Sequence, residues 1–148
     1  MKLLKICEMD WKQKISSLPK LRTYITFKFD FKVEPYITMN LNKQERSAMA
    51  QFRCGILPLR IETGRFTNEP PQERFCKLCN NGSIEDEEHF LLHCDAFKLH
   101  RETFYQNIRL DKNAHVNLNL KMLMENYQRQ TSKFINELFQ FRKQQLYK

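Results

Sequence analysis

The chain has 148 residues, of which 41% are hydrophobic and 12% are aromatic, enough apolar surface for one folded domain. This content excludes a chain that is disordered by composition. The formal net charge of +8 favours acidic partners, nucleic acid first and an anionic membrane surface second, although surplus lysines that only aid solubility would give the same balance.

The sequence shows no membrane span and no signal peptide. No stretch reaches the ~18 continuous apolar residues that a span requires, and the basic start of the chain meets Glu8 and Asp10 too early for a signal peptide. The five cysteines are an odd number, and three of them lie close together beside histidines, which suits metal ligation better than disulfides. We therefore expect a soluble protein of a reducing, intracellular compartment, either nucleus or cytoplasm, with no membrane partner.

The first predicted element is a strand. Apolar and polar side chains alternate between Tyr24 and Glu34, a pattern typical of a half-buried strand. The apolar members of this alternation are Ile25, Phe27, Phe29, Phe31 and Val33. The pattern predicts a short β or extended element within an N-terminal segment, residues 1–41.

A helix is predicted next, from Lys43 to Cys54. Asn42 followed by Glu45 resembles a capping box, and Gly55 is placed to end the helix. The stretch 55–72 holds three prolines and Gly64, so we expect a loop there.

Three further helices are predicted towards the C-terminus. Ser83 with Asp86 marks a helix start, and the acidic run 85–88 would lie favourably at the N-terminal dipole of a helix that continues to about Gln106. After the polar connection 111–113, apolar stripes predict helices at 118–127 and 132–147.

The expected fold is therefore mainly α with a short β or extended N-terminal element. We expect one compact unit made of the N-terminal segment 1–41, a helix plus zinc-binding module at 42–106, and a C-terminal helical segment at 107–148.

One constellation of residues indicates metal chemistry. Cys76 and Cys79 are separated by two residues, and a His and a third Cys follow little more than one helical turn apart. The four candidate ligands are Cys76, Cys79, His89 and Cys94. Two cysteines at this spacing form a knuckle around a tetrahedral zinc ion, and four protein ligands leave no open position for water or substrate. The motif predicts one structural Zn²⁺, with no catalytic residue and no small-molecule substrate.

The fourth ligand has an alternative. His93 lies four residues after His89, on the same face of a regular helix, whereas Cys94 lies five residues after it and requires the helix to tighten or bend. We favour Cys94 because a thiolate binds zinc strongly. The competing interpretation of the whole cluster is accidental spacing in a chain with five cysteines.

The remaining candidate ligands receive other assignments. Cys7 and Cys54 have no partner at ligand spacing, and an isolated Cys is most often a small buried hydrophobe, so we assign both to packing. His100 and His115 are assigned to the surface or to helix ends.

Arginines recur ahead of the cysteines, with aromatic residues between them. They are Arg53, Arg60, Arg65 and Arg74. Planar guanidinium groups suit phosphate oxygens and aromatic rings stack on bases, so these arginines are a candidate nucleic-acid surface. The alternative is that they pair with nearby carboxylates, such as Glu62 and Glu69, while the aromatic residues lie in the core.

A family resemblance extends from about Ala50 to Cys94. The runs AQFRCGILPLRIETGRF (50–66), ERFCKLC (73–79) and EEHFLLHC (87–94) closely resemble the zinc-binding segment that follows the reverse transcriptase of non-LTR retrotransposons. The resemblance implies that Cys76, Cys79, His89 and Cys94 are the metal ligands, which favours Cys94 over His93.

The resemblance also implies a function. In that family the segment helps the element's protein to engage RNA or target DNA. The Tyr-x-Asp-Asp signature of the polymerase is absent from these 148 residues, so we expect the C-terminal part of such a protein, without catalytic activity of its own. The alternative is a protein-interaction scaffold or a decayed remnant with a purely structural zinc.

Overall fold

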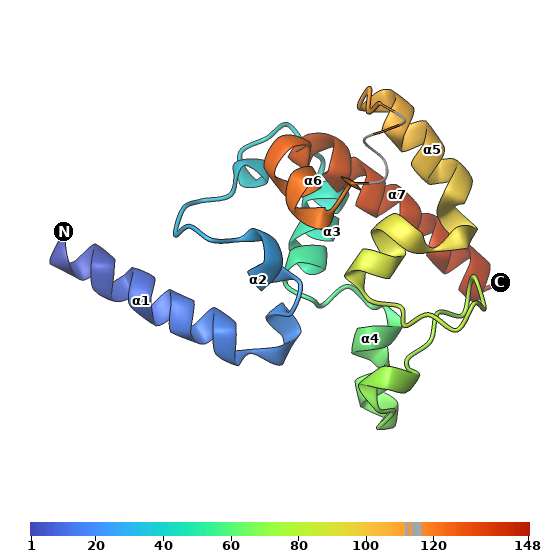
Figure 1. Cartoon of the computed structure of the whole chain (residues 1–148), viewed down its shortest axis with the longest axis horizontal. Helices are drawn as coiled ribbons and strands as arrows, with labels where there is room; N and C mark the ends of the chain where they lie inside the picture. The colour runs from blue at the N-terminus through green and yellow to red at the C-terminus, as the bar shows by residue number, and fades with distance from the viewer. Residues whose placement is uncertain (112, 114–116) are drawn as a thin grey trace.

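The computed structural model describes residues 1–111, 113 and 117–148 (Figure 1). The fold is mainly helical, as predicted, and the described residues contain no strand. The only β-type pairing among the described residues is an isolated antiparallel bridge between Phe75 and Ile84. Lys112, in the predicted polar connection, and His115, assigned to the surface, lie outside the described residues.

The α-helices of the described part are α1 (Lys2–Ser17), α2 (Tyr24–Phe27), α3 (Lys43–Arg53), α4 (Arg60–Thr63), α5 (Lys98–Asn107), α6 (Leu120–Asn126) and α7 (Gln128–Leu146). Short turns connect them, namely η1 (Pro19–Leu21), η2 (Pro35–Ile37), η3 (Gly64–Thr67), η4 (Pro71–Glu73), η5 (His89–His93) and η6 (Asp95–Phe97). None of the described helices combines the length and the apolar composition that a membrane crossing requires.

Much of the core lies between α3 and α7, which pack extensively against each other. Met49 and Phe52 of α3 and Ile135 and Leu138 of α7 are completely buried, since apolar side chains recur along one face of each helix. Helix α1 projects away from this body, at the left of the molecule in Figure 1.

Helix α3 begins and ends as predicted. The Asn42 side chain accepts a hydrogen bond from the Glu45 amide, and the Glu45 carboxylate accepts one from the Asn42 amide, so the capping box is confirmed. The chain then turns at Gly55, where φ is +66°. A Cβ atom there would lie 2.0 Å from the Lys20 carbonyl oxygen, so only glycine fits this crossing.

The predicted strand at residues 24–34 is wrong. Residues 24–27 form α2, and the following loop has no neighbouring strand to complete a hydrogen-bonded ladder. Phe29, Phe31 and Val33, on the apolar face of the alternation, are exposed, whereas Lys28 on its polar face is buried. Lys28 is held there by ion pairs with Asp30 and Glu34, so local electrostatics override the period-two pattern.

The helix predicted from Ser83 to Gln106 is interrupted. It is replaced by the wide turn η5, an extended Cys94 with φ −62° and ψ 122°, η6 and then α5. Helical backbone begins at Glu87, and not at Ser83, and the preceding Asp86 side chain accepts a hydrogen bond from the His89 amide at 2.8 Å. Helix α7 begins four residues before its predicted start, at Gln128.

Candidate metal centre

The structure brings the four predicted ligands together. The ligand atoms of Cys76, Cys79, His89 and Cys94 all lie within 4.8 Å of one another. The Sγ atoms of Cys76 and Cys94 are 3.8 Å apart, and the Sγ of Cys79 is 3.5 Å from Nε2 of His89. Cys79 is half-buried and the other three residues are buried, so the cluster can hold a metal ion out of contact with most of the solvent.

These separations fit tetrahedral coordination. Two sulfur atoms bound at about 2.3 Å to one tetrahedral ion lie about 3.8 Å apart, and a sulfur and an imidazole nitrogen lie about 3.6 Å apart. The observed distances of 3.8 Å and 3.5 Å match both values. These are two of the six separations among the four ligand atoms, all of which lie within 4.8 Å, so three thiols and one imidazole form a cluster that could hold a single ion.

The knuckle that carries Cys76 and Cys79 is built on a narrow turn. The Cys76 amide donates to the Ser83 carbonyl at 2.8 Å, and the Glu85 amide donates to the Arg74 carbonyl at 3.1 Å, so the two sides of the turn are tied together. The chain reverses through Asn80 and Gly82, both with positive φ. This backbone points both thiols to the same side.

The wide turn η5 decides the fourth ligand. The Cys94 amide donates to the His89 carbonyl at 2.8 Å, a five-residue hydrogen bond that is wider than that of an α-helix. This turn brings residue 94 to the same side as residue 89. His93 points away; its side chain is 61% exposed, and its ring nitrogen lies 3.4 Å from Glu88. The cluster consequently contains Cys94 and not His93.

Glu85 is a buried junction beside the cluster. Its carboxylate accepts two hydrogen bonds from the Arg142 guanidinium, both at 2.8 Å, and one from the Arg60 amide, also at 2.8 Å. One oxygen lies 4.0 Å from the Sγ of Cys76. Glu85 therefore joins the knuckle to the start of α4 and to the C-terminal helix α7.

A second buried carboxylate ties the turn η5 to the N-terminal part of the chain. Glu87 is fully buried and accepts hydrogen bonds from Arg22 at 2.6 Å and from the Thr23 hydroxyl at 2.8 Å. Sequence reasoning placed the run 85–88 at a helix dipole and missed both roles, because the partners Arg22 and Arg142 are remote in the sequence. The acidic run itself does not distinguish Glu85 and Glu87, which are buried, from Asp86 and Glu88, which are more exposed.

The charges around the cluster are balanced. Burial alone would lower the pKa of Arg142, but the Glu85 carboxylate raises it, so the guanidinium stays charged. Within the cluster, the hydrogen bond from Cys94 lowers the pKa of the Cys76 thiol, and the same contact, together with burial, raises that of Cys94. A metal ion bound by both sulfur atoms would displace the proton of this contact.

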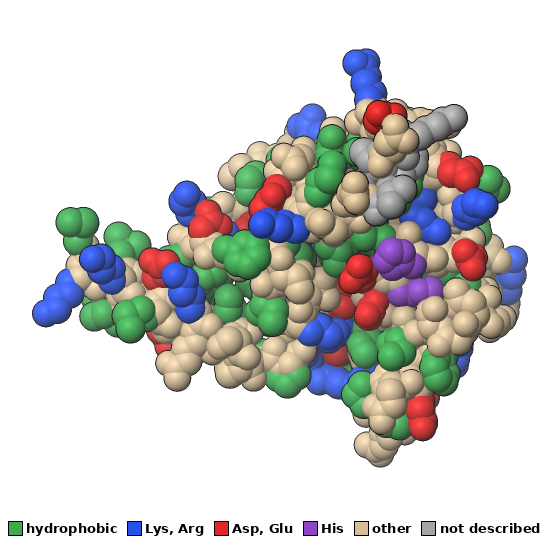
Figure 2. Space-filling model, viewed as in Figure 1, with side chains coloured by type: hydrophobic (Ala, Val, Ile, Leu, Met, Phe, Trp, Pro, Cys, Tyr) green, Lys and Arg blue, Asp and Glu red, His purple; other side chains and the backbone are tan. Residues whose placement is uncertain are grey.

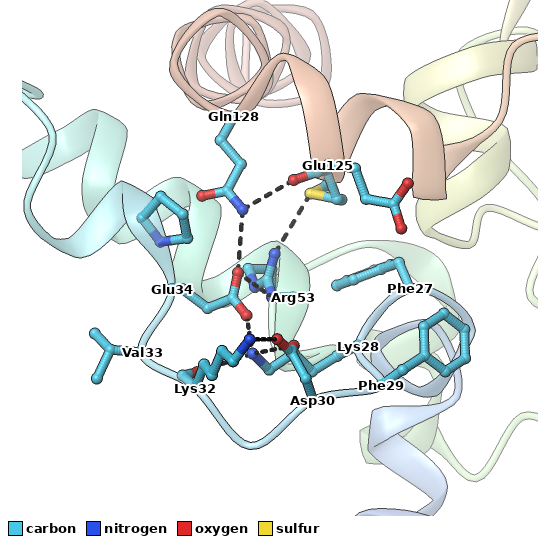
Figure 3. A pocket seen from close by; sticks show the side chains of 12 residues that line it. Phe27, Lys28, Phe29, Asp30, Lys32, Val33, Glu34, Arg53, Glu125 and Gln128 are labelled. Carbon is cyan, nitrogen blue, oxygen red and sulfur yellow. Dashed lines mark hydrogen bonds and ion pairs between the residues drawn. The ribbon is translucent and has the colours of Figure 1, made fainter.

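The four candidate phosphate-binding arginines are not gathered on one surface. Arg53 is only 2% exposed and forms an ion pair with Glu34 at 2.9 Å. The two side chains point toward each other in Figure 3. Its guanidinium also lies over the rings of Phe27, Tyr24 and Tyr36, at 4.7, 5.6 and 5.6 Å from their centroids. Arg53 is thus a core residue, enclosed by aromatic rings.

The other three arginines also have partners within the chain. Arg74 is buried and donates to the carbonyls of Ile61 and Glu69. Arg60 pairs with Glu69, and Arg65 pairs with Glu62 at 2.8 Å. Arg60 and Arg65 therefore pair with nearby carboxylates, as the alternative interpretation predicted. Of the four arginines, only Arg65 is exposed.

The other cysteines differ from their assignments, whereas His100 lies in the first turn of α5, a helix end, as assigned. Cys7 and Cys54 are exposed, not packed in the core, because Cys7 lies on the projecting α1 and Cys54 at the end of α3. His100 is half-buried against the Phe141 ring, with the ring centroids 4.6 Å apart. None of the three lies in the metal cluster.

Comparisons with protein-family models, curated proteins and solved structures gave no match. The geometry of the cluster is consequently the basis for the functional argument.

Proposed function

We propose that this chain is a zinc-stabilised helical module with one structural Zn²⁺ bound by Cys76, Cys79, His89 and Cys94. The observation that carries the proposal is the clustering of the four ligand atoms within 4.8 Å, with two of their separations at the values expected for tetrahedral coordination. Three thiolates and an imidazole favour zinc among the common biological ions, and this donor set excludes calcium and magnesium, which prefer oxygen ligands.

The proposed ion is a folding element. It would join the knuckle at 76–79 to the turn at 89–94, two segments with one isolated bridge and few backbone hydrogen bonds of their own. Structural zinc in small peptides contributes roughly 10–16 kcal/mol of binding free energy at neutral pH, part of which stabilises the fold. Because four protein ligands fill the coordination sphere, we assign no catalytic activity to this module.

Metal analysis of the purified protein tests this proposal. We expect one zinc per chain by elemental mass spectrometry, and less than a tenth of that in Cys76→Ser. Cys7→Ser, which changes an exposed cysteine outside the cluster, is the matched control and should keep one zinc. A wild-type protein purified without metal that also binds no added zinc would end the proposal.

We further propose that the module is the nucleic-acid-binding accessory part of a protein like the non-LTR retrotransposon reverse transcriptases. Two features support this beyond the resemblance, the net charge of +8 and a groove of about 400 Å³ between α3 and α7. Lys43 and Lys143 line the groove, and its polar side chains are otherwise amides and a hydroxyl, without a carboxylate. Such donors suit phosphate oxygens.

A binding titration with single-stranded RNA and duplex DNA tests this second step. The logarithm of the binding constant should fall linearly with the logarithm of the salt concentration, with a slope of about −0.7 to −0.9 for each phosphate contact. Lys143→Glu should weaken binding. Lys98→Glu, an exposed charge reversal on α5, should weaken it less. No binding to either nucleic acid at low salt would favour the alternative, a protein-interaction scaffold with a structural zinc.

A further inference from the structure

Arg101 is a buried cation for which the described part of the chain supplies no carboxylate partner. It lies on α5 and is 7% exposed. No ion pair joins it to a described residue, and its buried Nη1 atom has no hydrogen-bond partner. A guanidinium keeps its charge in proteins, and a buried charge without a partner is costly. The fold therefore has to compensate the charge of Arg101 in another way.

The other buried arginines of the described chain have partners. Arg53 and Arg142 each form an ion pair with a glutamate, and Arg74 donates to two backbone carbonyls. Exposed cations differ as well, since they meet water, and on the face seen in Figure 2 they lie interspersed with Asp and Glu side chains. Arg101 is thus the exception among the buried arginines that the structure describes.

Arg101 lies close to the metal cluster along the chain. The buried ligand Cys94 is followed by η6 and then by α5, and Arg101 lies in the first turn of α5. In Figure 1, α5 follows the yellow turn η5. Side chains on an α-helix lean toward its N-terminal end. The Arg101 side chain consequently leans toward the end of α5 that adjoins Cys94.

The charges around Arg101 agree with this position. Burial lowers the pKa of its guanidinium, whereas Tyr105, Cys94, Asp95 and Glu102 raise it. The phenol of Tyr105 is uncharged at neutral pH, because burial raises its pKa. Asp95 and Glu102 are exposed, so water screens their charges. Cys94 is completely buried, so a negative charge on its sulfur atom would be screened least.

A zinc ion in the cluster would generate the missing negative charge. Cysteines bind zinc as thiolates and histidine binds it as a neutral imidazole. The three thiolates of the cluster exceed the two positive charges of Zn²⁺ by one, so the loaded centre is an anion. Arg142 does not neutralise it, because its guanidinium is already paired with Glu85.

We propose that Arg101 compensates the negative charge of the zinc–thiolate centre from the side of Cys94, and so raises the affinity of the cluster for zinc. The inference rests on the zinc site proposed above. Arg101 would act on the thiolate and not as a ligand. Groups in this outer position typically contribute roughly 10- to 100-fold to metal affinity.

Zinc affinity, measured by competition with a chromophoric chelator, tests the proposal. Arg101→Met removes the charge but keeps a long side chain, and it should weaken zinc binding about tenfold or more. Lys98→Met removes an exposed positive charge from the same helix, so it is the matched control and should change the affinity less than about twofold. Arg101→Lys keeps the charge and should lose less affinity than Arg101→Met.

A change of ligand charge separates charge compensation from packing. Cys79 is half-buried, and Cys79→His would give a site of two thiolates and two imidazoles, whose zinc centre is neutral. In this background Arg101→Met should no longer weaken zinc binding, because the centre has no negative charge to compensate. Equal losses in both backgrounds would show that Arg101 acts through packing, and would overturn the proposal.

The zinc content of the wild type separates this proposal from the one on which it rests. A wild type that binds no zinc would end both, whereas an Arg101→Met protein with unchanged zinc affinity would overturn this proposal alone. Where Arg101→Met does not fold or Cys79→His binds no zinc, Arg101→Lys decides. An affinity close to that of the wild type supports the proposal, and a loss of more than about tenfold, despite the retained charge, overturns it.

Discussion

At the scale of single residues, the metal cluster depends on which side chains η5 turns inward. Cys94 is buried beside Cys76, whereas His93 faces solvent. We predict that Cys94→Ser loses tightly bound zinc and unfolds at a lower temperature, because one of four donors is removed. His93→Ala should retain one zinc, and its free energy of unfolding should differ from that of the wild type by less than about 0.5 kcal/mol, as is usual for exposed substitutions. Zinc content and thermal unfolding measure both, and a Cys94→Ser protein that keeps its zinc would assign the site to His93.

Glu85 stabilises the region around the cluster through its ion pair with Arg142, and not as a ligand of the metal. Replacing it with Gln leaves the Arg142 charge buried without a carboxylate, since that guanidinium is 4% exposed. We predict that Glu85→Gln lowers the free energy of unfolding by about 3–5 kcal/mol in urea. Glu88→Gln changes a carboxylate that is 58% exposed and should cost under about 0.5 kcal/mol. Equal effects of the two substitutions would contradict the role assigned to Glu85.

The clustering of the four candidate ligands could be predicted from the sequence because they are close to each other in it. Cys76 and Cys79 form one knuckle, and His89 and Cys94 lie on one turn, so spacing alone constrains their geometry. The roles of Arg53 and Arg142 could not be predicted in this way. Their partners, Glu34 and Glu85, are far away along the chain, and only packing decides which carboxylate a buried guanidinium meets.

At the scale of elements, the crossing of Gly55 with the chain at Lys20 fixes the exit from α3. We predict that Gly55→Ala costs at least about 2 kcal/mol, because the new methyl group would meet the Lys20 carbonyl and the positive φ is unfavourable for alanine. Gly82 also has positive φ but has open space around it, so Gly82→Ala should cost about 1 kcal/mol. Urea unfolding of both variants measures the difference, and similar losses would show that the close approach at Lys20 does not matter.

The elements differ in how far sequence predicts them. The capping box of Asn42 and Glu45 uses neighbouring residues, and α3 begins where it predicts. The alternation at 24–34 fails because a strand needs a partner that the fold does not supply. The helix break at Cys94 could not be predicted from the pattern of apolar residues, because that pattern continues past the break through Phe97 and Phe104.

At the scale of the whole molecule, the metal cluster and the α3–α7 core occupy different parts of the fold, and we expect them to contribute separately to stability. We predict that a chelator raises backbone hydrogen exchange first in residues 74–97, which the cluster holds together, and later in α3 and α7, whose buried faces pack on each other. Hydrogen exchange with mass spectrometry measures the order. Uniform loss of protection would mean that the ion is required for the entire fold.

Cobalt substitution tests the central claim most directly. Titration of the metal-free protein with Co²⁺ should saturate at one equivalent, with the intense visible absorption of a tetrahedral ion and the near-ultraviolet charge-transfer band of thiolate ligands, and one equivalent of Zn²⁺ should abolish both. Coordination of one Co²⁺ ion by the three sulfur atoms and the imidazole of the cluster would give this spectrum. A weak spectrum typical of octahedral cobalt, or no spectrum at all, would contradict the proposed zinc centre.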